Sequence, residues 1–339
     1  MPQIKTVLLT GATGFVGQSV YPALCRAGYD VVCASRHPER GRAQHPQRVW
    51  ARVDVDDPAS LDAAMRGCDA AVYLVHGMGA GGDYEARERR GAVNFRDAAG
   101  RAKLRRVVYL GGVRPAGEVS RHLRSRLATG ELLRAGDTPT VELQASMIVG
   151  AGSESWRIVR DLAARLPAMV LPRWLETRSQ PVAVADVVNA IVHAVAQPAR
   201  GSAAYPIPGP EVLSVREVIE RAAGLMGLRP SMYAVPLLTP RLSSYWIRLV
   251  TRANGHVAEE LVEGLRGDLV VSGDGYWSLF PEYERTPFDV AARRALEGEA
   301  RSLSLRARAV EGAIRAVGPL VSRRWVRSAA PAPLRVARP

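Results

Sequence analysis

A doubly wound α/β fold, in which helices cover both faces of a parallel sheet, is the fold class that the sequence predicts. Two observations support it. Short apolar runs alternate with amphipathic stretches over about the first 150 residues, and a glycine-rich turn joins the first apolar run to the first amphipathic stretch. Strands that alternate with helices form βαβ units, and these units build a parallel sheet. Because 339 residues exceed one domain of ordinary size, a smaller C-terminal portion is expected beside the sheet.

The expected elements follow from the spacing of apolar residues. Strands are predicted at residues 7–10, 31–34, 70–75, 107–111 and 141–149. Helices are predicted directly after Gly14 and at residues 60–66, 84–102 and 123–134. Gly28 and Gly136 fall where helix C-caps are expected. Beyond residue 150 the pattern predicts helices at 156–166 and 215–226, a strand followed by a helix at 182–196, and a proline-rich loop at 206–210.

The spacing of cysteine and histidine indicates neither a disulfide framework nor a metal site. Cys25, Cys33 and Cys68 form no C-x-x-C pair, so all three are expected to be buried thiols in a reducing compartment. The six histidines form no H-x-x-x-H or Cys/His group of the kind that binds zinc. No signal peptide is recognised, and no uncharged apolar run approaches the roughly 18–20 residues of a membrane span. The expected location is the cytoplasm.

The basic character of the chain is concentrated at its C-terminal end. The net charge is +13, but residues 301–339 contain nine arginines and a single acidic residue. Val310, Ile314, Val317 and Val321 share one face of a helical wheel, so this tail either docks on the body or makes peripheral contact with an anionic membrane. Nucleic acid is not an expected partner, because no recognition helix or aromatic-interleaved basic patch is found. The pattern favours no particular oligomeric state.

The glycine-rich turn predicts a site for a dinucleotide. Three glycines spaced three residues apart lie between the first strand and the first helix. The first allows a tight turn, the second lets the backbone approach a pyrophosphate, and the third lets the helix pack on the strand. The pyrophosphate would lie at the positive end of the helix dipole. The alternative is a merely structural turn. The cofactor-binding residues predicted at this turn are Gly11, Thr13, Gly14, Phe15, Val16 and Gly17.

The end of the second strand bears on the choice of cofactor. NAD-specific sites usually carry an acidic residue there, which holds the ribose 2′-hydroxyl. This sequence has Ser35 and Arg36 instead, which suit the 2′-phosphate of NADP. NADP(H) is therefore the predicted cofactor and NAD(H) the alternative, since Arg36 would equally serve as a solvated surface arginine. Asp54 and Val55, at the end of the third strand, are expected beside the adenine.

Several motifs resemble one protein family. They are T-G-A-T-G-F-V-G at 10–17, D-V-D-D-P-A-S-L at 54–61, Y-L-V-H-G-M-G at 73–79, Q-P-V-A-V-A-D-V at 180–187 and G-P-E-V-L-S at 209–214. Together they resemble the extended and atypical short-chain dehydrogenase/reductases (SDRs), above all the NmrA-like and complex-I-accessory-subunit-like members. The resemblance covers roughly residues 5–300 and implies a Rossmann fold. It also adds Leu74 and Asn94 to the expected cofactor-binding residues.

The sequence departs from that family at its catalytic set. The family typically reduces carbonyls with Ser at the end of the fifth strand, then Tyr and Lys four residues apart on the next helix. Here the strand ends in two glycines, and His122 and Arg126 take the Tyr and Lys positions. His122 has an ordinary pKa near 6.5, which would suit a general acid near neutral pH. The alternative is a histidine on the helix surface. His76, after the fourth strand, is a rival proton donor, or else a loop histidine bonded to backbone.

The C-terminal portion is expected to bind the substrate. Candidate lining residues are Trp174, Tyr245 and Trp246, with Met147, Met226 and Leu238 beside them, although such apolar residues serve equally as plain core. Few polar groups accompany them, which favours a hydrophobic substrate such as a quinone, an aromatic ketone or an isoprenoid. The chain is thus divided into an NAD(P)-binding Rossmann domain at 1–150, remaining sheet elements with a substrate-binding portion at 151–300, and a basic amphipathic tail at 301–339.

The predicted activity is that of an NAD(P)H-dependent oxidoreductase of the atypical SDR kind. It would reduce a carbonyl or quinone-like group of a hydrophobic small molecule, with the proton from His122, His76 or water. The alternative is a non-catalytic NAD(P)-binding redox sensor or assembly protein. Such a protein would keep the fold after losing the usual catalytic set.

Overall fold

The main sheet has seven parallel strands and confirms the predicted fold class. The computed structural model describes residues 4–76, 83–115, 117–165, 168–171, 176–198, 201–229, 231–234 and 267–302. The strand order in the sheet is β11-β6-β5-β4-β1-β2-β3. The strands are β1 (Thr6–Leu9), β2 (Asp30–Ser35), β3 (Val49–Arg52), β4 (Ala70–Tyr73), β5 (Arg106–Gly112), β6 (Thr140–Ala145) and β11 (Ala203–Pro206). Every residue of the central strands β4 and β5 is buried, as expected for parallel strands covered on both faces.

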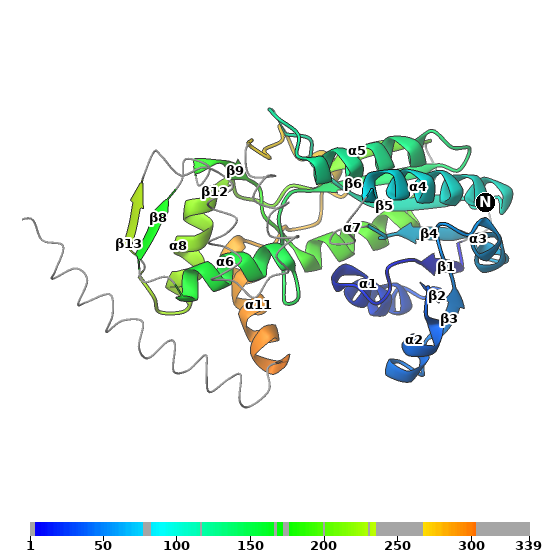
Figure 1. The fold of residues 1–339 in the computed structure, drawn as a ribbon, viewed down its shortest axis with the longest axis horizontal. Helices are drawn as coiled ribbons and strands as arrows, with labels where there is room; N and C mark the ends of the chain where they lie inside the picture. The colour runs from blue at the N-terminus through cyan, green and yellow to red at the C-terminus, as the bar shows by residue number, and fades with distance from the viewer. Residues whose placement is uncertain are drawn as a thin grey trace, which may run out of the picture.

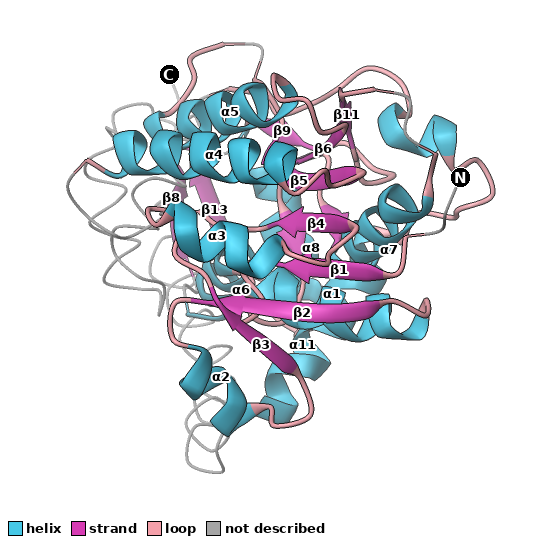
Figure 2. Ribbon diagram, turned by 90° about the vertical axis from the view of Figure 1, so that its right-hand side faces the viewer, coloured by secondary structure: helices cyan, strands magenta, loops and turns pink. Residues whose placement is uncertain are grey.

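Helices cover both faces of this sheet (Figure 2). On one face, α1 (Phe15–Arg26) and α7 (Val184–Ala196) pack against each other and form one hydrophobic core with the strands. On the other face, α3 (Pro58–Met65), α4 (Tyr84–Arg101) and α5 (Arg121–Arg134) form a second core. The short α2 (Pro38–Gln44) lies next to β3. The sheet thus has the doubly wound arrangement, with its carboxyl edge available for a ligand.

A smaller group of elements lies beyond the carboxyl edge of the sheet (Figure 1). Its helices α6 (Glu154–Arg165), α8 (Val215–Leu225) and α11 (Phe288–Ser302) share a third hydrophobic core. Three two-stranded pairs accompany them, and η2 (Gly275–Leu279) packs near β11. The pairs are β7 (Ile148–Val149) with β10 (Val182–Ala183), β9 (Arg178–Ser179) with β12 (Leu213–Ser214), and β8 (Ala168–Leu171) with β13 (Ser231–Ala234).

The chain crosses between the two parts more than once. Strand β11 and helix α7 both come from beyond residue 150, yet they belong to the main sheet and its covering layer. They are the remaining sheet elements expected in the 151–300 segment. The division of the chain at residues 150 and 300 stays a prediction, and the tail from residue 303 onward lies outside the described residues.

Some sequence expectations were wrong in detail. The apolar run at 141–149 is two strands, because the chain leaves the main sheet after Ala145 and β7 pairs with β10 instead. Strand β3 ends at Arg52, so Asp54 and Val55 lie in the loop after it. Pro206 ends β11 rather than standing in a loop, which an edge strand tolerates.

The three cysteines differ in their exposure. Cys33 is buried and Cys68 is half-buried, but Cys25 is exposed on α1, contrary to expectation. Within the part of the chain that the structure describes, no helix is both long and apolar enough to cross a lipid bilayer. The same residues contain no cluster of three His, Cys, Asp or Glu side chains able to hold a metal ion.

Candidate functional site

The glycine turn between β1 and α1 is shaped by close backbone approach. Gly11 has a φ of +64°, and a Cβ there would stand 2.9 Å from the Leu74 carbonyl oxygen. A Cβ on Gly17 would stand only 2.1 Å from the Gly11 carbonyl oxygen, so the helix can approach the turn only with glycine at this position. Gly14 has ordinary extended angles, and a Cβ there would lie 3.2 Å from the same oxygen. The first and third glycines therefore shape the turn, and the second keeps its outer surface clear.

The N-terminus of α1 fits the diphosphate of a dinucleotide. Helix α1 begins at Phe15, and no side chain caps it at Gly14. The first N–H groups of a helix have no partner within the helix and carry the positive end of its dipole. The clear surface at Gly14 lets a diphosphate reach these groups, as in other dinucleotide sites. The turn has both the space and the donors that the group requires.

Most of the remaining predicted cofactor residues lie at the end of β2 or in the loops that follow β2 and β3. Arg36 is exposed, and its side chain has no hydrogen bond or ion pair with the described residues. The Ser35 hydroxyl accepts a hydrogen bond from the His37 backbone N–H at 3.1 Å. The Asn94 side-chain amide donates to the Val55 carbonyl at 2.9 Å, so Asn94 ties α4 to the loop that carries Asp54 and Val55.

A single pocket of about 510 Å³ extends from the glycine turn to α6 and α8. It joins ten of the residues that the sequence singled out, namely Gly11, Gly14, Phe15, Val16, Gly17, Leu74, His76, His122, Arg126 and Met147. Six others lie outside its lining, namely Thr13, Ser35, Arg36, Asp54, Val55 and Asn94. Met226 also lies outside it, against the third hydrophobic core. Trp174, Leu238, Tyr245 and Trp246 fall outside the described residues.

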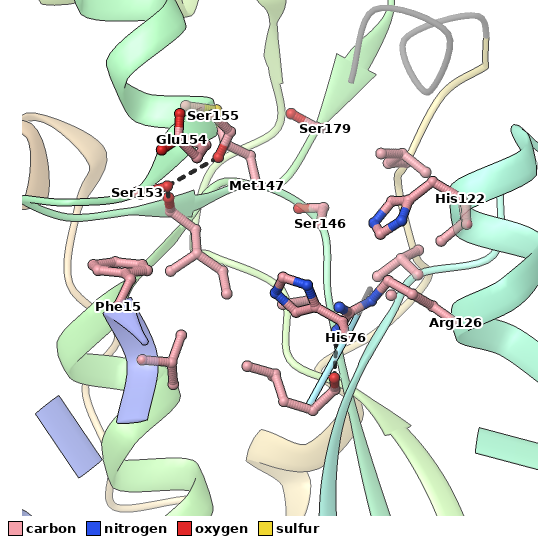
Figure 3. A pocket seen from close by; sticks show the side chains of 18 of the residues that line it. Phe15, His76, His122, Arg126, Ser146, Met147, Ser153, Glu154, Ser155 and Ser179 are labelled. Carbon is pink, nitrogen blue, oxygen red and sulfur yellow. Dashed lines mark hydrogen bonds between the residues drawn. The ribbon is translucent and has the colours of Figure 1, made fainter. Parts of the chain in front are cut away.

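The sequence analysis missed several lining residues. The loop after β6 and the start of α6 contribute Ser146, Ser153, Glu154 and Ser155 (Figure 3). The Ser153 hydroxyl bonds to the Ile148 carbonyl at 2.7 Å and lies 3.0 Å from the Ser155 hydroxyl. Isolated serines after a strand have no motif that marks them, and only the fold brings them to the pocket.

Two histidines and one arginine form the polar wall opposite Phe15 (Figure 3). The rings of His76 and His122 lie edge to face, with centroids 6.5 Å apart. The Arg126 guanidinium donates a hydrogen bond to the Leu110 carbonyl at the end of β5. His122 and Arg126 are four residues apart on α5 and therefore share one helix face. The structure thus brings together all three candidate catalytic residues.

Both imidazoles are held in their neutral form. Burial lowers the pKa of His122 to about 3, with further contributions from the Arg126 cation and from His76. Burial, followed by the Arg126 cation, also lowers the pKa of His76 to about 4, although the surface of this residue is more exposed than that of His122. The expectation of a pKa near 6.5 for His122 was wrong, because this residue does not lie on the exposed surface of the helix. It is only 9% exposed. At neutral pH these rings are neutral hydrogen-bonding groups rather than imidazolium acids.

The lowered pKa of His122 predicts a pH dependence of stability. Unfolding returns the ring to its ordinary pKa near 6.5, so below that pH the unfolded chain binds a proton that the folded chain does not. The stabilisation is complete above pH 6.5 and declines as the pH falls toward 3. We expect His122→Gln to reduce the slope of unfolding free energy against pH by up to about 1.4 kcal/mol per pH unit between pH 4 and 6. Urea titrations at several pH values measure this slope, and equal slopes for both proteins would contradict it.

Gly112, at the end of β5, lies close to the helix that carries His122 and Arg126. A Cβ on Gly112 would stand 2.5 Å from a terminal methyl carbon of Leu123 and 3.8 Å from the Arg126 Nε. A serine at this position would therefore require the Leu123 side chain to move. With glycine here, α5 packs closely on the end of β5.

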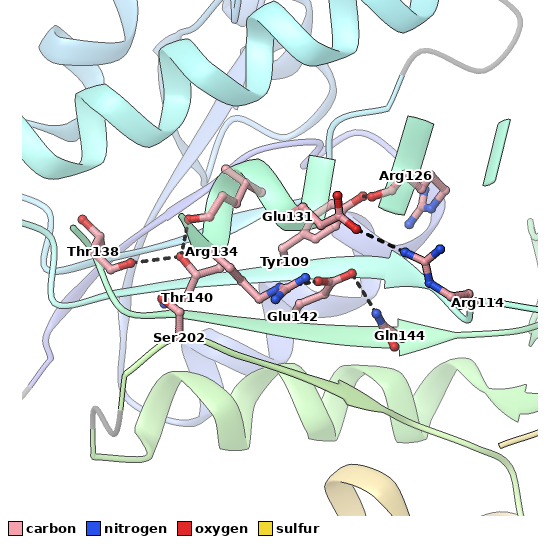
Figure 4. Close-up of polar contacts among 11 residues, drawn as sticks. Tyr109, Arg114, Arg126, Glu131, Arg134, Thr138, Thr140, Glu142, Gln144 and Ser202 are labelled. Carbon is pink, nitrogen blue, oxygen red and sulfur yellow. Dashed lines mark hydrogen bonds and ion pairs between the residues drawn. The ribbon is translucent and has the colours of Figure 1, made fainter. Parts of the chain in front are cut away.

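A buried ion pair fixes α5 against the sheet (Figure 4). The fully buried Glu142 carboxylate on β6 accepts from the Arg134 Nε at 2.8 Å and from the Gln144 side-chain amide at 3.1 Å. It lies against Gly130 of α5, where a Cβ would approach the carboxylate to 2.4 Å. The Tyr109 hydroxyl donates to the Arg126 carbonyl at 3.0 Å. These contacts fix the distance of α5 from the sheet and its rotation about the helix axis, and α5 carries His122 and Arg126.

Comparisons with known proteins agree with this site. Residues 11–160 match a family model described as NAD(P)H-binding. The chain is 26% identical to ceramide reductase of Caulobacter vibrioides over 238 residues, covering 68% of this chain and 73% of that protein. It is 28% identical to dihydroflavonol 4-reductase of Dianthus caryophyllus over 126 residues, covering 32% of this chain. The matched segment is only 34% of the length of that second relative.

Solved structures share the fold at low identity. Triphenylmethane reductase of a Citrobacter species superposes with a TM-score of 0.68 at 16% identity, covering 86% of this chain and 99% of that one. UDP-glucose 4-epimerase of Thermotoga maritima superposes with a TM-score of 0.64 at 12% identity, covering 88% and 100%. At such identities the likeness establishes the fold alone.

The glycine turn, the uncapped helix and the family match define an NAD(P)H-binding protein with a Rossmann-type sheet. Residues 11–160 match the NAD(P)H-binding family model, and the fold and the relatives agree with the resemblance of the sequence motifs to the atypical SDRs. At this level the predicted binding of NAD(P)H is confirmed.

Proposed function

We propose that the protein uses NADPH to reduce a carbonyl or quinone-like group of a hydrophobic small molecule. The observation that carries this proposal is the continuity of one pocket. That pocket joins the glycine turn, the His76–His122–Arg126 wall and an apolar end between α6 and α8. A reductase needs these three parts in this order, namely a cofactor site, a polar group for the acceptor oxygen, and a surface that holds the rest of the substrate.

The residues of the polar wall have distinct parts in this proposal. Bound NADPH supplies a hydride, and the protein positions the acceptor and stabilises the negative charge that develops on its oxygen. A neutral imidazole holds a proton on one ring nitrogen and donates it as a hydrogen bond to that oxygen. The Arg126 guanidinium has five N–H donors, so its bond to the Leu110 carbonyl leaves others for the pocket. Because neither imidazole is charged at neutral pH, the proton that completes the product comes from water entering the pocket.

The relatives support a reductase through their names. Ceramide reductase and dihydroflavonol 4-reductase are both named for reduction. The Citrobacter triphenylmethane reductase has been solved in complex with NADP(H). The names of the relatives are not sufficient by themselves, because this chain has His122 and Arg126 in place of the usual Tyr and Lys. The proposal that this protein is a reductase therefore also rests on the polar wall formed by His76, His122 and Arg126.

The direct test is NADPH oxidation against a panel of quinones and of aromatic and aliphatic ketones. We expect oxidation, followed by the loss of absorbance at 340 nm, with at least one hydrophobic acceptor. Tight NADPH binding without oxidation by any acceptor would instead favour the non-catalytic redox sensor or assembly protein.

Cofactor preference gives a separate prediction. We expect NADPH to bind more tightly than NADH, because Arg36 is exposed and free of partners among the described residues at the end of β2. Arg36→Ala should weaken NADPH binding by about 1.5–3 kcal/mol, the value of a hydrogen bond to a charged group, and change NADH binding little. Arg40→Ala, an exposed arginine on α2, is the control and should keep the preference. Equal dissociation constants for NADPH and NADH in the unmodified protein would contradict this prediction.

A further inference from the structure

The part of the pocket between α6 and α8 is walled by two aliphatic stripes. On α6, Ile158, Val159 and Leu162 line the pocket, and on α8 the lining residues are Val215, Val218 and Ile219. Both sets have the i, i+3, i+4 type of spacing that places residues on one helix face. The two helices pack against each other and share the third hydrophobic core. We name the space between these six residues the aliphatic slot.

The chemistry of the slot restricts what it can hold. None of its six side chains has a hydrogen-bond donor, an acceptor or a charge, and none has an aromatic ring for stacking. Among the described lining residues of the whole pocket, Phe15 is the only Phe, Tyr or Trp, and it lies at the glycine turn. Such walls bind through buried apolar area alone, so affinity grows with the amount of hydrocarbon buried.

The same lining argues against a sugar nucleotide in this position. A diphosphate requires several cationic or N–H donors. Arg126 is the only arginine or lysine among the described residues of the pocket wall, and one guanidinium supplies a single positive charge to a group that carries two. The fold is shared with a UDP-glucose epimerase, but the slot offers nothing to a charged or polyhydroxylated group.

From these observations we infer that the slot binds an aliphatic chain of the substrate, so that the protein acts on a long-chain carbonyl compound. This inference rests on the proposed function and makes its substrate class definite. The reactive carbonyl lies at the polar wall of His76, His122 and Arg126, and the chain extends away from it between α6 and α8.

A chain-length series tests the inference. NADPH oxidation is measured with 2-alkanones from 2-pentanone to 2-dodecanone, and KM should fall by roughly threefold to fourfold per added methylene until the slot is filled. Val215 is half-buried at the first turn of α8, where it packs against the third core, and Val215→Trp is chosen to fill the slot, with circular dichroism to check that the variant is folded. This variant should raise KM for 2-dodecanone at least 30-fold and leave 2-pentanone within twofold. Glu220→Trp, on the exposed face of the same helix, is the matched control and should behave like the unmodified protein.

A binding measurement separates this inference from the proposed function. cis-Parinaric acid, a fluorescent polyene fatty acid, should bind the unmodified and Glu220→Trp proteins, be displaced better by dodecanol than by hexanol, and bind Val215→Trp poorly. If this pattern appears without NADPH oxidation, binding of an aliphatic chain in the slot is supported and the proposed reductase activity is rejected. If small aromatic ketones are reduced but KM ignores chain length and parinaric acid does not bind, the reductase stands and the aliphatic slot is overturned.

Discussion

Replacing Gly14 by valine is expected to weaken NADPH binding at least about 100-fold while leaving the fold intact. The φ and ψ angles of Gly14 are −81° and 170°, which valine adopts without strain, and a Cβ would lie at a tight but tolerable 3.2 Å from the Gly11 carbonyl. The branched side chain would instead fill the space in front of α1, where the diphosphate meets the free N–H groups. Losing one or two hydrogen bonds to a charged group, at about 1.5–3 kcal/mol each, accounts for the effect.

Two further glycines make this experiment specific. Gly224→Ala is the control, because nothing lies within 4 Å of a Cβ on this glycine of α8, and NADPH affinity should not change. Gly17→Ala is expected to lower thermal stability as well, because its Cβ would overlap the Gly11 carbonyl. Fluorescence titration gives the dissociation constants, and circular dichroism gives the melting temperatures. A Gly14→Val protein that binds NADPH like the unmodified one would show that the diphosphate is held elsewhere.

Removing either histidine of the polar wall should slow turnover by about 10²- to 10³-fold, the usual effect of losing one donor to a developing oxyanion. His122→Ala and His76→Ala test the two rings, and His122→Asn, which keeps a side-chain N–H, should recover part of the loss. His45→Ala, outside the pocket lining, should keep full activity. The comparison is made on kcat/KM with a hydrophobic ketone and saturating NADPH.

The pH profile distinguishes a neutral donor from an imidazolium acid. With the pKa of His122 at about 3 and that of His76 at about 4, neither ring titrates between pH 5 and 8. The rate should therefore show no step near pH 6.5 in this range. A step near pH 6.5 that disappears in His122→Ala would mean that the ring acts as a charged acid. If both alanine variants keep kcat/KM within threefold of the unmodified protein, the histidines take no part in the reaction.

The sequence was sufficient for those parts of the site that depend on local pattern. The glycine turn is contiguous, so residues 11–17 predict both their backbone shape and their ligand. His122 and Arg126 are four residues apart on one helix, so their shared direction also follows from spacing alone. The central strands, which are buried on both faces, stand out as short apolar runs.

Features that arise from packing between distant elements could not be predicted from the sequence. The neutral state of His122 depends on its burial and on the nearby Arg126 and His76, the last contributed by the loop after β4. The close approach of Leu123 to Gly112 depends on how α5 packs on β5. The aliphatic slot could not be recognised because residues such as Ile158 and Val218 belong to the hydrophobic core and to the pocket wall at once. In sequence, such a stripe is typical of any core-facing helix.

The measurement that tests the central claim most directly is transfer of deuterium from the cofactor to a product. The protein is incubated with a hydrophobic ketone and NADPH deuterated at either the pro-R or the pro-S position of C4, and the product is examined by mass spectrometry. The account predicts that one of the two labelled cofactors, and not the other, delivers a single deuterium to the former carbonyl carbon. This transfer should disappear in Gly14→Val. Product without label from either cofactor, or no product despite bound NADPH, would contradict it.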